Sequence, residues 1–240
     1  MISMTKEKGK ERNKKSRQAG PTLLFDLDGT LIDSVYQHIL AWREALEQVG
    51  MLFSNASIHR RIGMSGDLVV RSFVRDSGRK FNSKETEYLK ERHADAYKKR
   101  EGEIRLLPGA HDLISTLSKL NIPIAIGTSG KRQDAEKPLD MLGVGTAVTV
   151  VTADDVQNAK PAPDLFLACA GKLGADIKDC IIVGDSTWDI LAAQRARTLG
   201  VGLLSGGFGE DELLRAGAYR VYRDPADLLL RLDELGIQSR

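Results

Sequence analysis

Cysteine and long apolar runs are both scarce in this sequence of 240 residues. Its two cysteines, Cys169 and Cys180, are too few for a disulfide framework and lack the close spacing of a redox or zinc pair. No apolar run approaches the roughly 20 residues that cross a bilayer, and no apolar segment follows the charged N-terminus as it does in a signal peptide. These absences argue against a disulfide scaffold and a membrane-spanning protein, and we expect a soluble cytoplasmic protein.

A strong net charge is missing as well. The 35 Lys and Arg residues nearly balance the 33 Asp and Glu residues, so no overall field indicates nucleic acid or a membrane as a partner. Residues 1–20 differ, because seven cationic side chains stand there against two acidic ones, with almost no apolar side chain between them. We predict a disordered basic leader in this segment; a tail that binds an anionic surface is the alternative.

From Thr22 onward, short apolar runs that end in polar or glycine-rich sequence alternate with helix-like stretches. With 42% hydrophobic residues, the chain can bury a sizeable core. The alternation predicts an α/β fold, a Rossmann-like doubly wound parallel sheet with helices on both faces. Strands are expected at 23–25, 122–126, 147–151, 180–183 and 201–204, and helices at 109–120, 162–173, 187–198 and 225–235.

Residues 36–104 break this alternation. They lack a convincing apolar strand and are typical of several amphipathic helices rich in Arg, Lys and Glu. The first of these helices is expected to stop at Gly50, and a glycine-punctuated stretch at 61–66 separates it from the next. We therefore predict a helical domain at 36–104, inserted into a core formed by residues 21–35 and 105–240.

Four polar clusters follow the ends of predicted strands. Because the carboxyl ends of parallel strands share one edge of a sheet, these clusters are expected to converge. Several carboxylates in one place repel each other unless a cation joins them, and an all-oxygen cluster suits Mg²⁺. Nearby hydroxyls, loop amides and an ammonium suit a tetrahedral oxyanion, so the set indicates phosphoryl transfer, although any one acid alone would be an ordinary turn or cap residue. The clusters are Asp26 with Asp28, Thr128 with Ser129, Lys160, and Asp185 with Asp189.

These segments carry a resemblance to a known family. DLDGTLIDS at 26–34 resembles the first motif of the haloacid-dehalogenase-like (HAD) hydrolases. GTSG at 127–130, KPAPD at 160–164 and VGDSTWD at 183–189 resemble the second, third and fourth motifs, in the same order and strand context. The resemblance covers roughly residues 22–235 and implies a Mg²⁺-dependent enzyme that acts on a small-molecule phosphomonoester.

The resemblance implies a role for each motif acid. Asp26 would attack phosphorus and become an aspartyl phosphate, and Asp28 would protonate the leaving oxygen and then activate water. Family members that act on carbon–halogen bonds carry a different residue at the position of Asp28, so a phosphatase is implied. Mg²⁺ would be held by the carboxylates of Asp26 and Asp185 and by the backbone carbonyl of Asp28. Asp189 would either bind the ion directly or contact one of its ligands.

The second and third motifs would bind the phosphate. The Thr128 hydroxyl and the Ser129 amide would contact phosphate oxygens, and Lys160 would neutralise charge on Asp26 and on the phosphate. A helix N-cap role for Thr128 is compatible with this one. A solvated surface lysine is the alternative for Lys160, but its place on a stiff turn before Pro161 favours the functional role.

The place of the insertion resembles the helical cap of the phosphoglycolate phosphatase and β-phosphoglucomutase branch. Such a cap excludes water and selects a small substrate. Residues 63–66 are the expected specificity loop, and Arg60 and Arg61 would either meet a second anionic group or merely solvate a helix end. The position of His38 resembles that of the hinge histidine of β-phosphoglucomutase. We expect His38 to act as a hinge or a substrate contact, and a plain helix-surface residue is the alternative.

Other features are interpreted as structural. Trp188 is expected to pack behind the metal loop, and the glycine-rich segment 205–209 to form a mobile turn near the site. Three histidines without metal spacing are assigned to helix or loop surface: His59, His93 and His111.

Two other functions are considered beside that of a phosphatase: a phosphosugar mutase and a non-catalytic binding module. Gly66 stands about where the mutase cap would supply an arginine, and Gly184 with Asp185 replaces the mutase's Glu-Asp pair. Intact motif residues speak against a binding module. We therefore expect a Mg²⁺-dependent phosphatase, monomeric by default, whose substrate could be phosphoglycolate, a sugar or sugar-like phosphate, or a nucleotide.

Overall fold

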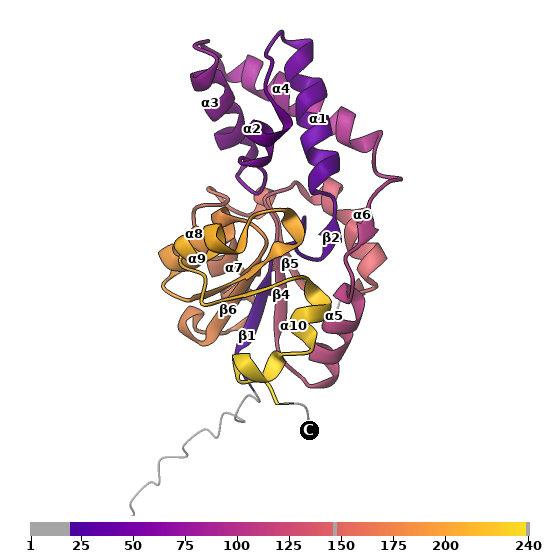
Figure 1. Ribbon diagram of the computed structural model, residues 1–240, viewed down its shortest axis with the longest axis vertical. Helices are drawn as coiled ribbons and strands as arrows, with labels where there is room; N and C mark the ends of the chain where they lie inside the picture. Colours follow the sequence, from indigo (N-terminus) through magenta and orange to yellow (C-terminus); the bar gives the residue numbers. More distant parts are fainter. Residues whose placement is uncertain (1–19, 146–147, 239–240) are drawn as a thin grey trace, which may run out of the picture.

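The computed structural model describes residues 20–145 and 148–238, so the predicted leader lies outside the described residues except for Gly20. Six parallel strands form one sheet in the order β5-β4-β1-β6-β7-β8 (Figure 1). This confirms the predicted Rossmann-like parallel sheet. The strands are β1 (Thr22–Phe25), β4 (Ile124–Gly127), β5 (Thr149–Val151), β6 (Cys180–Gly184), β7 (Leu199–Leu203) and β8 (Arg220–Tyr222).

Strand β1 lies at the centre and is buried along its whole length. It pairs with β4 on one side and β6 on the other, so the chain order runs outward from β1 in both directions. In such sheets the carboxyl ends of the central strands form a crevice that binds ligands. The residues that follow β1, β4 and β6 therefore meet at one edge.

Helices cover both faces of the sheet, as the alternating side chains of β1 require. Leu23 and Phe25 belong to one apolar cluster, with residues of α5 (Ala110–Lys119), α6 (Arg132–Leu142) and α10 (Pro225–Leu229). Leu24 points into a second cluster, with residues of α7 (Asp164–Leu173) and α8 (Thr187–Ala196). Helix α9 (Glu210–Arg215) packs against β7 and β8 through Leu213.

The first four helices after β1 in the chain stand above the carboxyl edge of the sheet (Figure 1). They share their own apolar cluster, in which Trp42 of α1 meets Phe73 of α3 and Leu89 of α4. Ser54, Ser65 and Asn82 cap the second, third and fourth helices through their side chains. We call these helices the cap: α1 (Val35–Gln48), α2 (Asn55–His59), α3 (Gly66–Asp76) and α4 (Ser83–Lys98).

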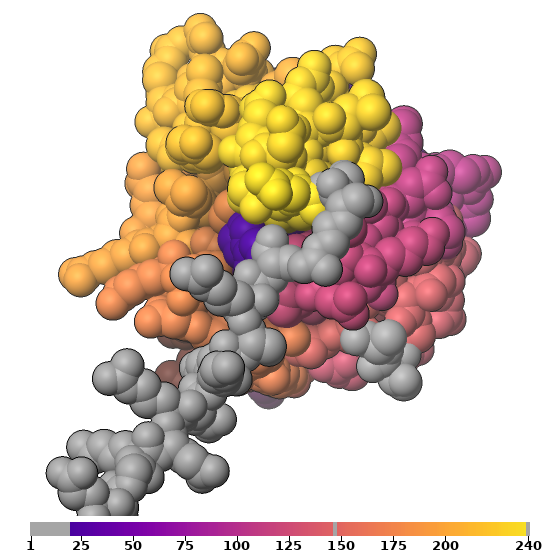
Figure 2. All heavy atoms as spheres, turned by 90° about the horizontal axis from the view of Figure 1, so that it is seen from below, coloured from indigo at the N-terminus to yellow at the C-terminus, as the bar shows by residue number. Residues whose placement is uncertain are grey.

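The two chain crossings between core and cap lie side by side. Strand β2 (Ile32–Asp33) precedes α1, and β3 (Arg105–Leu106) follows α4; the two pair antiparallel. At the opposite end of the molecule, Figure 2 shows the start of β1 in indigo beside the C-terminal segments in yellow. The cap is thus tethered through one short double strand, far from that end.

Several elements were not predicted from the sequence. These are α6, α9, β8 and the β2–β3 pair, together with short 3-10 turns at Ala153–Asp155, Ile177–Asp179 and Leu204–Gly206. The helix expected at 225–235 ends at Leu229, and a separate 3-10 turn covers Leu232–Leu235. Within 20–145 and 148–238, no helix has the length and apolar character needed to cross a membrane.

Candidate active site

Three acids and one lysine meet at the carboxyl edge of the sheet. Carboxylate oxygens of Asp26, Asp185 and Asp189 all lie within 4.8 Å of one another. Asp26 follows β1, Asp185 follows β6, and Asp189 lies in the first turn of α8. The Lys160 ammonium reaches the group from the loop before α7, 2.5 Å from Asp26 Oδ1 and 2.9 Å from Asp189 Oδ1. All four residues are at most 3% exposed.

This buried group is short of positive charge, because three carboxylates face one ammonium. Burial raises the pKa of Asp26 from 3.8 to about 7, with Lys160 opposing the shift. Burial and the neighbouring carboxylates of Asp189 and Asp26 raise the pKa of Asp185 well above its ordinary value. Burial alone would lower the pKa of Lys160, but the two acids that it contacts raise it, so the ammonium stays charged. A buried all-oxygen group with excess negative charge fits a hard divalent cation such as Mg²⁺.

Asp185 is held by close contacts from two loops. The Thr30 hydroxyl donates to Asp185 Oδ1 at 3.0 Å. A Cβ atom at Gly206 would lie 1.7 Å from Asp185 Oδ2, and one at Gly29, where φ is +82°, would lie 2.5 Å from it. Neither position can carry a side chain while Asp185 stays in place. The motif residue Gly29 could be found from sequence; Gly206 lies outside every motif.

Asp189 has both carboxylate oxygens engaged. Oδ1 contacts Lys160, and Oδ2 accepts hydrogen bonds from the backbone N–H of Ser186 at 3.1 Å and from its hydroxyl at 2.5 Å. The contacts between Ser186 and Asp189 form the capping box of α8. A Cβ at Gly184 would lie 2.2 Å from Asp189 Cγ, so the glycine allows Asp189 to fold back over the end of β6.

Asp28 lies beside this group and is held by hydroxyl and imidazole partners. The Ser34 hydroxyl donates to Asp28 Oδ1 at 2.6 Å, and His38 Nε2 lies 3.4 Å from the same oxygen. Burial would raise the pKa of Asp28, but His38 and the hydrogen bonds from His38 and Ser34 lower it below its ordinary value. His38 comes from the first turns of the cap helix α1, so the cap contributes directly to the environment of Asp28.

His38 is itself oriented by α4. Its Nδ1 lies 3.2 Å from His93 Nε2, and its ring stacks on that of Tyr97 at 4.0 Å between centroids. Burial lowers the pKa of His93 well below the ordinary range, with His38 adding to the effect. His93 was assigned to the surface from the sequence; the structure shows it partly buried beside His38, in the lining of the space between core and cap.

The second motif forms the loop after β4. Thr128 is buried, and its Oγ1 accepts a hydrogen bond from the Gly130 backbone N–H at 3.0 Å, which leaves the Thr128 hydroxyl proton able to donate. The Ser129 hydroxyl donates to the carbonyl of Gly63 in the cap at 3.2 Å. The loop thus faces both the acidic group and the cap.

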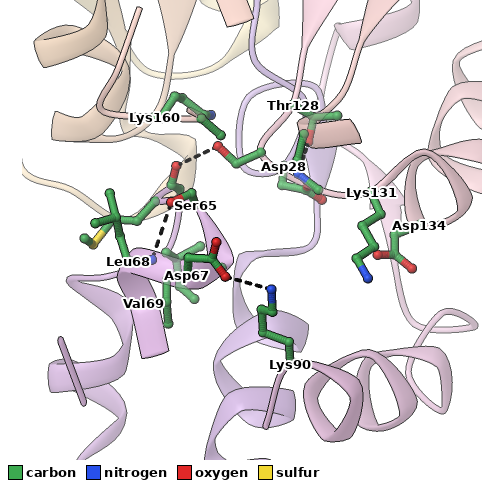
Figure 3. A pocket seen from close by; sticks show the side chains of 18 of the residues that line it. Asp28, Ser65, Asp67, Leu68, Val69, Lys90, Thr128, Lys131, Asp134 and Lys160 are labelled. Atoms are coloured by element: carbon green, nitrogen blue, oxygen red, sulfur yellow. Dashed lines mark hydrogen bonds and ion pairs between the residues drawn. The ribbon is translucent and has the colours of Figure 1, made fainter. Parts of the chain in front are cut away.

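A cavity of about 690 Å³ lies between the core and the cap. It is lined on the core side by Asp26, Asp28, Thr128 and Lys160, and on the cap side by residues 61–69 and by α4. Figure 3 shows Ser65 of the cap beside Lys160, and the pair formed by Lys90 and Asp67 facing the same space. All the sequence-predicted site residues except Asp185 and Asp189 line this cavity. Asp185 and Asp189 lie behind the lining, next to Asp26.

Arg61 does not present a free guanidinium to the cavity. It contacts Asp76, donates to the hydroxyls of Ser57 and Ser72, and lies over the Phe73 ring at 4.8 Å. Arg60 pairs with Glu212 of the core. Both arginines hold parts of the protein together, which speaks against their predicted role with a second anionic group of a substrate.

This architecture defines an enzyme of the HAD type: a parallel α/β core with an acidic group at the end of its central strands, covered by a helical insertion. The family model of the haloacid dehalogenase-like hydrolases matches residues 21–197. The chain belongs to this family, within the branch whose members carry a helical cap.

Relatives of known name support the assignment. The chain is 30% identical to a β-phosphoglucomutase of Bacillus subtilis over 88% of its own length and 92% of that protein. It is 34% identical to hexitol phosphatase A of Escherichia coli, over 72% of this chain and 78% of that one. A hydrolase of Pseudomonas syringae has a similar crystal structure, with a TM-score of 0.87 and 49% identity, covering 90% of this chain and 99% of that chain.

Proposed function

We propose that the protein is a Mg²⁺-dependent phosphatase that hydrolyses a small-molecule phosphomonoester through an aspartyl-phosphate intermediate. The observation that carries this proposal is the contact of Lys160 with Asp26 inside an acidic group next to the cavity between core and cap. The group suits a carboxylate nucleophile that must accept a phosphoryl group next to a metal ion.

Two carboxylates divide the chemistry. Asp26 forms a bond to phosphorus while the ester oxygen leaves and takes a proton from Asp28. Asp28 then removes a proton from a water molecule that attacks the aspartyl phosphate, which releases inorganic phosphate and restores Asp26. Ser34 and His38, at 2.6 and 3.4 Å, fix the carboxylate of Asp28 for both proton transfers.

Mg²⁺ would be held by Asp26, Asp185 and the backbone carbonyl of Asp28, and when bound it supplies the positive charge that lets an anionic phosphate approach an anionic carboxylate. Asp189 acts through Lys160, because its two oxygens are taken by Lys160 and Ser186. The Thr128 hydroxyl and the Ser129 backbone N–H bind the phosphate oxygens, and Lys160 offsets charge on the phosphate and on Asp26.

A sugar or sugar-like phosphate is the substrate class that the cavity lining and the relatives together support. Two of the cap cations that line the cavity, Arg61 and Lys90, are paired with acids, Lys90 with Asp67 at 2.7 Å and with Glu87 at 2.5 Å, whereas a third, Arg71, is exposed. Uncharged polar side chains such as Ser65, Gln133 and Asn158 also line the space. The similarity to a hexitol phosphatase and to a fructose-1-phosphate phosphatase of Escherichia coli supports this substrate class.

A phosphosugar mutase is the second candidate, favoured by the similarity to β-phosphoglucomutase and by the contact of His38 with Asp28. Two positions argue against it. Gly66 gives the cap loop no cation for a second phosphate. A glutamate at position 184 would collide with Asp189, since even a Cβ there lies 2.2 Å from its Cγ. Hydrolysis is therefore the function we propose.

We also propose that one chain acts alone in the cytoplasm. Its core, residues 21–35 and 105–240, and its cap, residues 36–104, together supply every residue assigned to the reaction, so no second copy is needed to complete the site. The sedimentation coefficient of the active protein at assay concentration tests this point.

The deciding experiment measures inorganic phosphate released from sugar phosphates, phosphoglycolate and nucleoside monophosphates, with Mg²⁺ and with EDTA. Release that requires Mg²⁺ and is lost in Asp26→Asn supports the proposal and ranks the substrates. A parallel assay follows isomerisation of a hexose 1-phosphate with a catalytic amount of the hexose 1,6-bisphosphate. Isomerisation without net phosphate release would identify a mutase instead.

A further inference from the structure

A second line of contact joins cap and core, away from the double strand that tethers them. It connects the end of α2 with the core segment Gly206–Glu212. His59 Nε2 lies 2.7 Å from the Gly206 carbonyl, and because a carbonyl can only accept, Nε2 carries the proton and donates. Arg60 Nη1 lies 2.5 Å from Glu212 Oε1. The sequence alone gave no reason to bring these segments together.

Aromatic side chains of the core complete the contact. The buried Phe208 ring lies 5.0 Å from the His59 ring and 5.3 Å from the Arg60 guanidinium carbon. Trp188, which was expected to pack behind the metal loop, donates through its indole N–H to the Arg60 carbonyl at 3.1 Å. Both the backbone and the side chain of Arg60 are thus held by the core.

Arg60 leads directly into the cap turn that reaches the candidate active site. The Gly63 carbonyl of this turn accepts from Ser129, and the Ser65 backbone N–H donates to the Lys160 carbonyl at 2.9 Å. The fit is tight, since a Cβ at Gly63 would lie 2.7 Å from Ser186 Oγ. Residues 60–65 are thus held against the core at both ends, by Arg60 and by Ser65.

We propose that His59 and Arg60, together with Gly206, Trp188 and Glu212, form a latch that holds the cap turn 63–65 over the active site. They are positioning residues, which act through the turn and not by touching the substrate. The cap is tethered at one side by β2 and β3 and held at the other by the latch, so a weaker latch leaves the turn displaced for a larger share of the time. The kinetic consequence rests on the proposed function; the contact itself does not.

A charge swap tests the latch. Arg60→Glu and Glu212→Arg each place like charges together, whereas the double variant restores opposite charges in reversed order. The matched control is Asp211→Arg, because Asp211 is the neighbouring residue of α9, is 80% exposed in its side chain and pairs only with Arg215 of its own helix among the described contacts. Arg60 and Glu212 are both partly exposed, so neither change opens a cavity in the core. Each also removes a smaller contact, Arg60 with the Phe208 ring and Glu212 with the Gly209 N–H, which the double variant does not restore.

Two measurements are made on each variant. Hydrogen exchange of the Ser65 amide, followed by NMR, reports how often its bond to the Lys160 carbonyl opens; steady-state phosphate release reports KM and kcat. We expect each single variant to raise the exchange rate and KM by about 2–5-fold, as for a partly exposed ion pair, with a smaller change in kcat. The double variant is expected to return both values toward those of the wild type.

The latch is wrong if the single variants match Asp211→Arg in Ser65 exchange, or if the double variant gives no recovery. Trp188→Phe, which keeps an aromatic ring at the position and removes the indole N–H donor, should raise the same exchange rate; an unchanged rate would count against the latch. Because amide exchange needs no substrate, it decides the question even where no phosphomonoester is hydrolysed. Failure of the latch and failure of the proposed function are therefore distinguishable.

Discussion

Lys160 Nζ lies 2.5 Å from Asp26 Oδ1, although the two residues belong to loops that follow different strands. The lysine also contacts Asp189, so one ammonium holds two buried carboxylates. A buried carboxylate stays ionised at neutral pH only with a cation beside it, and Asp26 must be ionised to attack phosphorus. The pair is therefore a condition both for the stability of the site and for its chemistry.

Replacing this lysine is expected to damage both properties. Lys160→Met removes the charge and keeps most of the apolar stem, so it leaves the buried carboxylates of Asp26 and Asp189 without their cation. The free energy of unfolding at pH 7 should fall by about 3–5 kcal/mol, because breaking a buried ion pair leaves uncompensated charge. The pKa of Asp26 should rise further, and phosphate release at pH 7 should fall with it. Urea unfolding and phosphate release measure the two effects.

Lys172→Met is the matched control. Lys172 is about half exposed and lies 3.7 Å from Asp155, so the change should shift the free energy of unfolding by no more than about 0.5 kcal/mol. Equal losses in the two variants would show that Lys160 contributes no more than a surface lysine, and the role proposed for it would have to be given up.

Mg²⁺ should stabilise the protein more at high pH than at low pH. The pKa of Asp26 is 3.8 as an ordinary side chain and about 7 in the folded, metal-free protein. Between these values the folded state binds more protons than the unfolded state, so the metal-free protein loses stability as the pH rises. Mg²⁺ binding replaces those protons and relieves the repulsion. At 100 times its Kd, the ion should add about 2.7 kcal/mol.

Thermal unfolding at pH 5, 6.5 and 8, with Mg²⁺ or with EDTA at matched ionic strength, measures this effect. The gain in Tm from Mg²⁺ should grow across the series in the wild type and should be largely absent in Asp185→Asn. A gain that is equal at all three pH values would contradict competition between protons and the metal at this group.

The sequence predicted those site residues that come directly after a strand of the sheet. Asp26, Thr128 and Asp185 could be placed together because each comes directly after an apolar run, and parallel strands bring such positions to one edge. Lys160 lies farther from its strand, and the resemblance of KPAPD to the third motif added it to the group. Apolar periodicity likewise indicated the core strands and the helical insertion. The polar helix α6 and the short strand β8 were missed, because their burial depends on neighbours that only the folded chain provides.

Contacts between cap and core were beyond prediction for a related reason. Nothing in the local pattern around His59 or Glu212 distinguishes them from solvated helix ends, since their partners lie about 150 residues away in the chain. Arg61 shows the reverse case. Its place beside a glycine-rich loop suggested a substrate contact, yet Asp76 and Phe73 of α3 occupy its guanidinium. Such choices are made by packing, which spacing does not encode.

Gly206 should be intolerant of even one methyl group. A Cβ there would lie 1.7 Å from Asp185 Oδ2, so Gly206→Ala must displace either the turn or the carboxylate. We expect a loss of about 1–3 kcal/mol from overpacking and a weaker affinity for Mg²⁺. Thermal unfolding and isothermal titration with Mg²⁺ measure the two effects.

Gly171→Ala provides the comparison, because no atom lies within 4 Å of a Cβ at that position and the residue lies inside helix α7. This change should be neutral or should stabilise the protein by about 0.5–1 kcal/mol, with unchanged Mg²⁺ affinity. If Gly206→Ala behaved in the same way, the turn at 204–206 would not hold Asp185.

His38 should matter for turnover in proportion to its hold on Asp28. His38→Ala removes the imidazole 3.4 Å from Asp28 Oδ1 and leaves Ser34 as the remaining side-chain partner among the described contacts. Losing an orienting contact of this kind commonly costs about 10–100-fold in rate, so kcat/KM for phosphate release should fall by that amount. His111→Ala, at an exposed histidine that pairs with its neighbour Asp112, should leave kcat/KM unchanged.

Substitutions of His93 test whether its hydrogen bond fixes the orientation of the His38 ring beside Asp28. His93→Gln keeps an amide that can donate to or accept from His38 Nδ1, whereas His93→Leu removes this hydrogen bond. If the hydrogen bond orients His38, kcat/KM should fall more in His93→Leu than in His93→Gln, and His93→Leu should have little further effect in the His38→Ala background, because residues that act through one another are not additive. Equal losses in the two His93 variants would point to packing in the cap, and full additivity would show that His93 acts independently of His38.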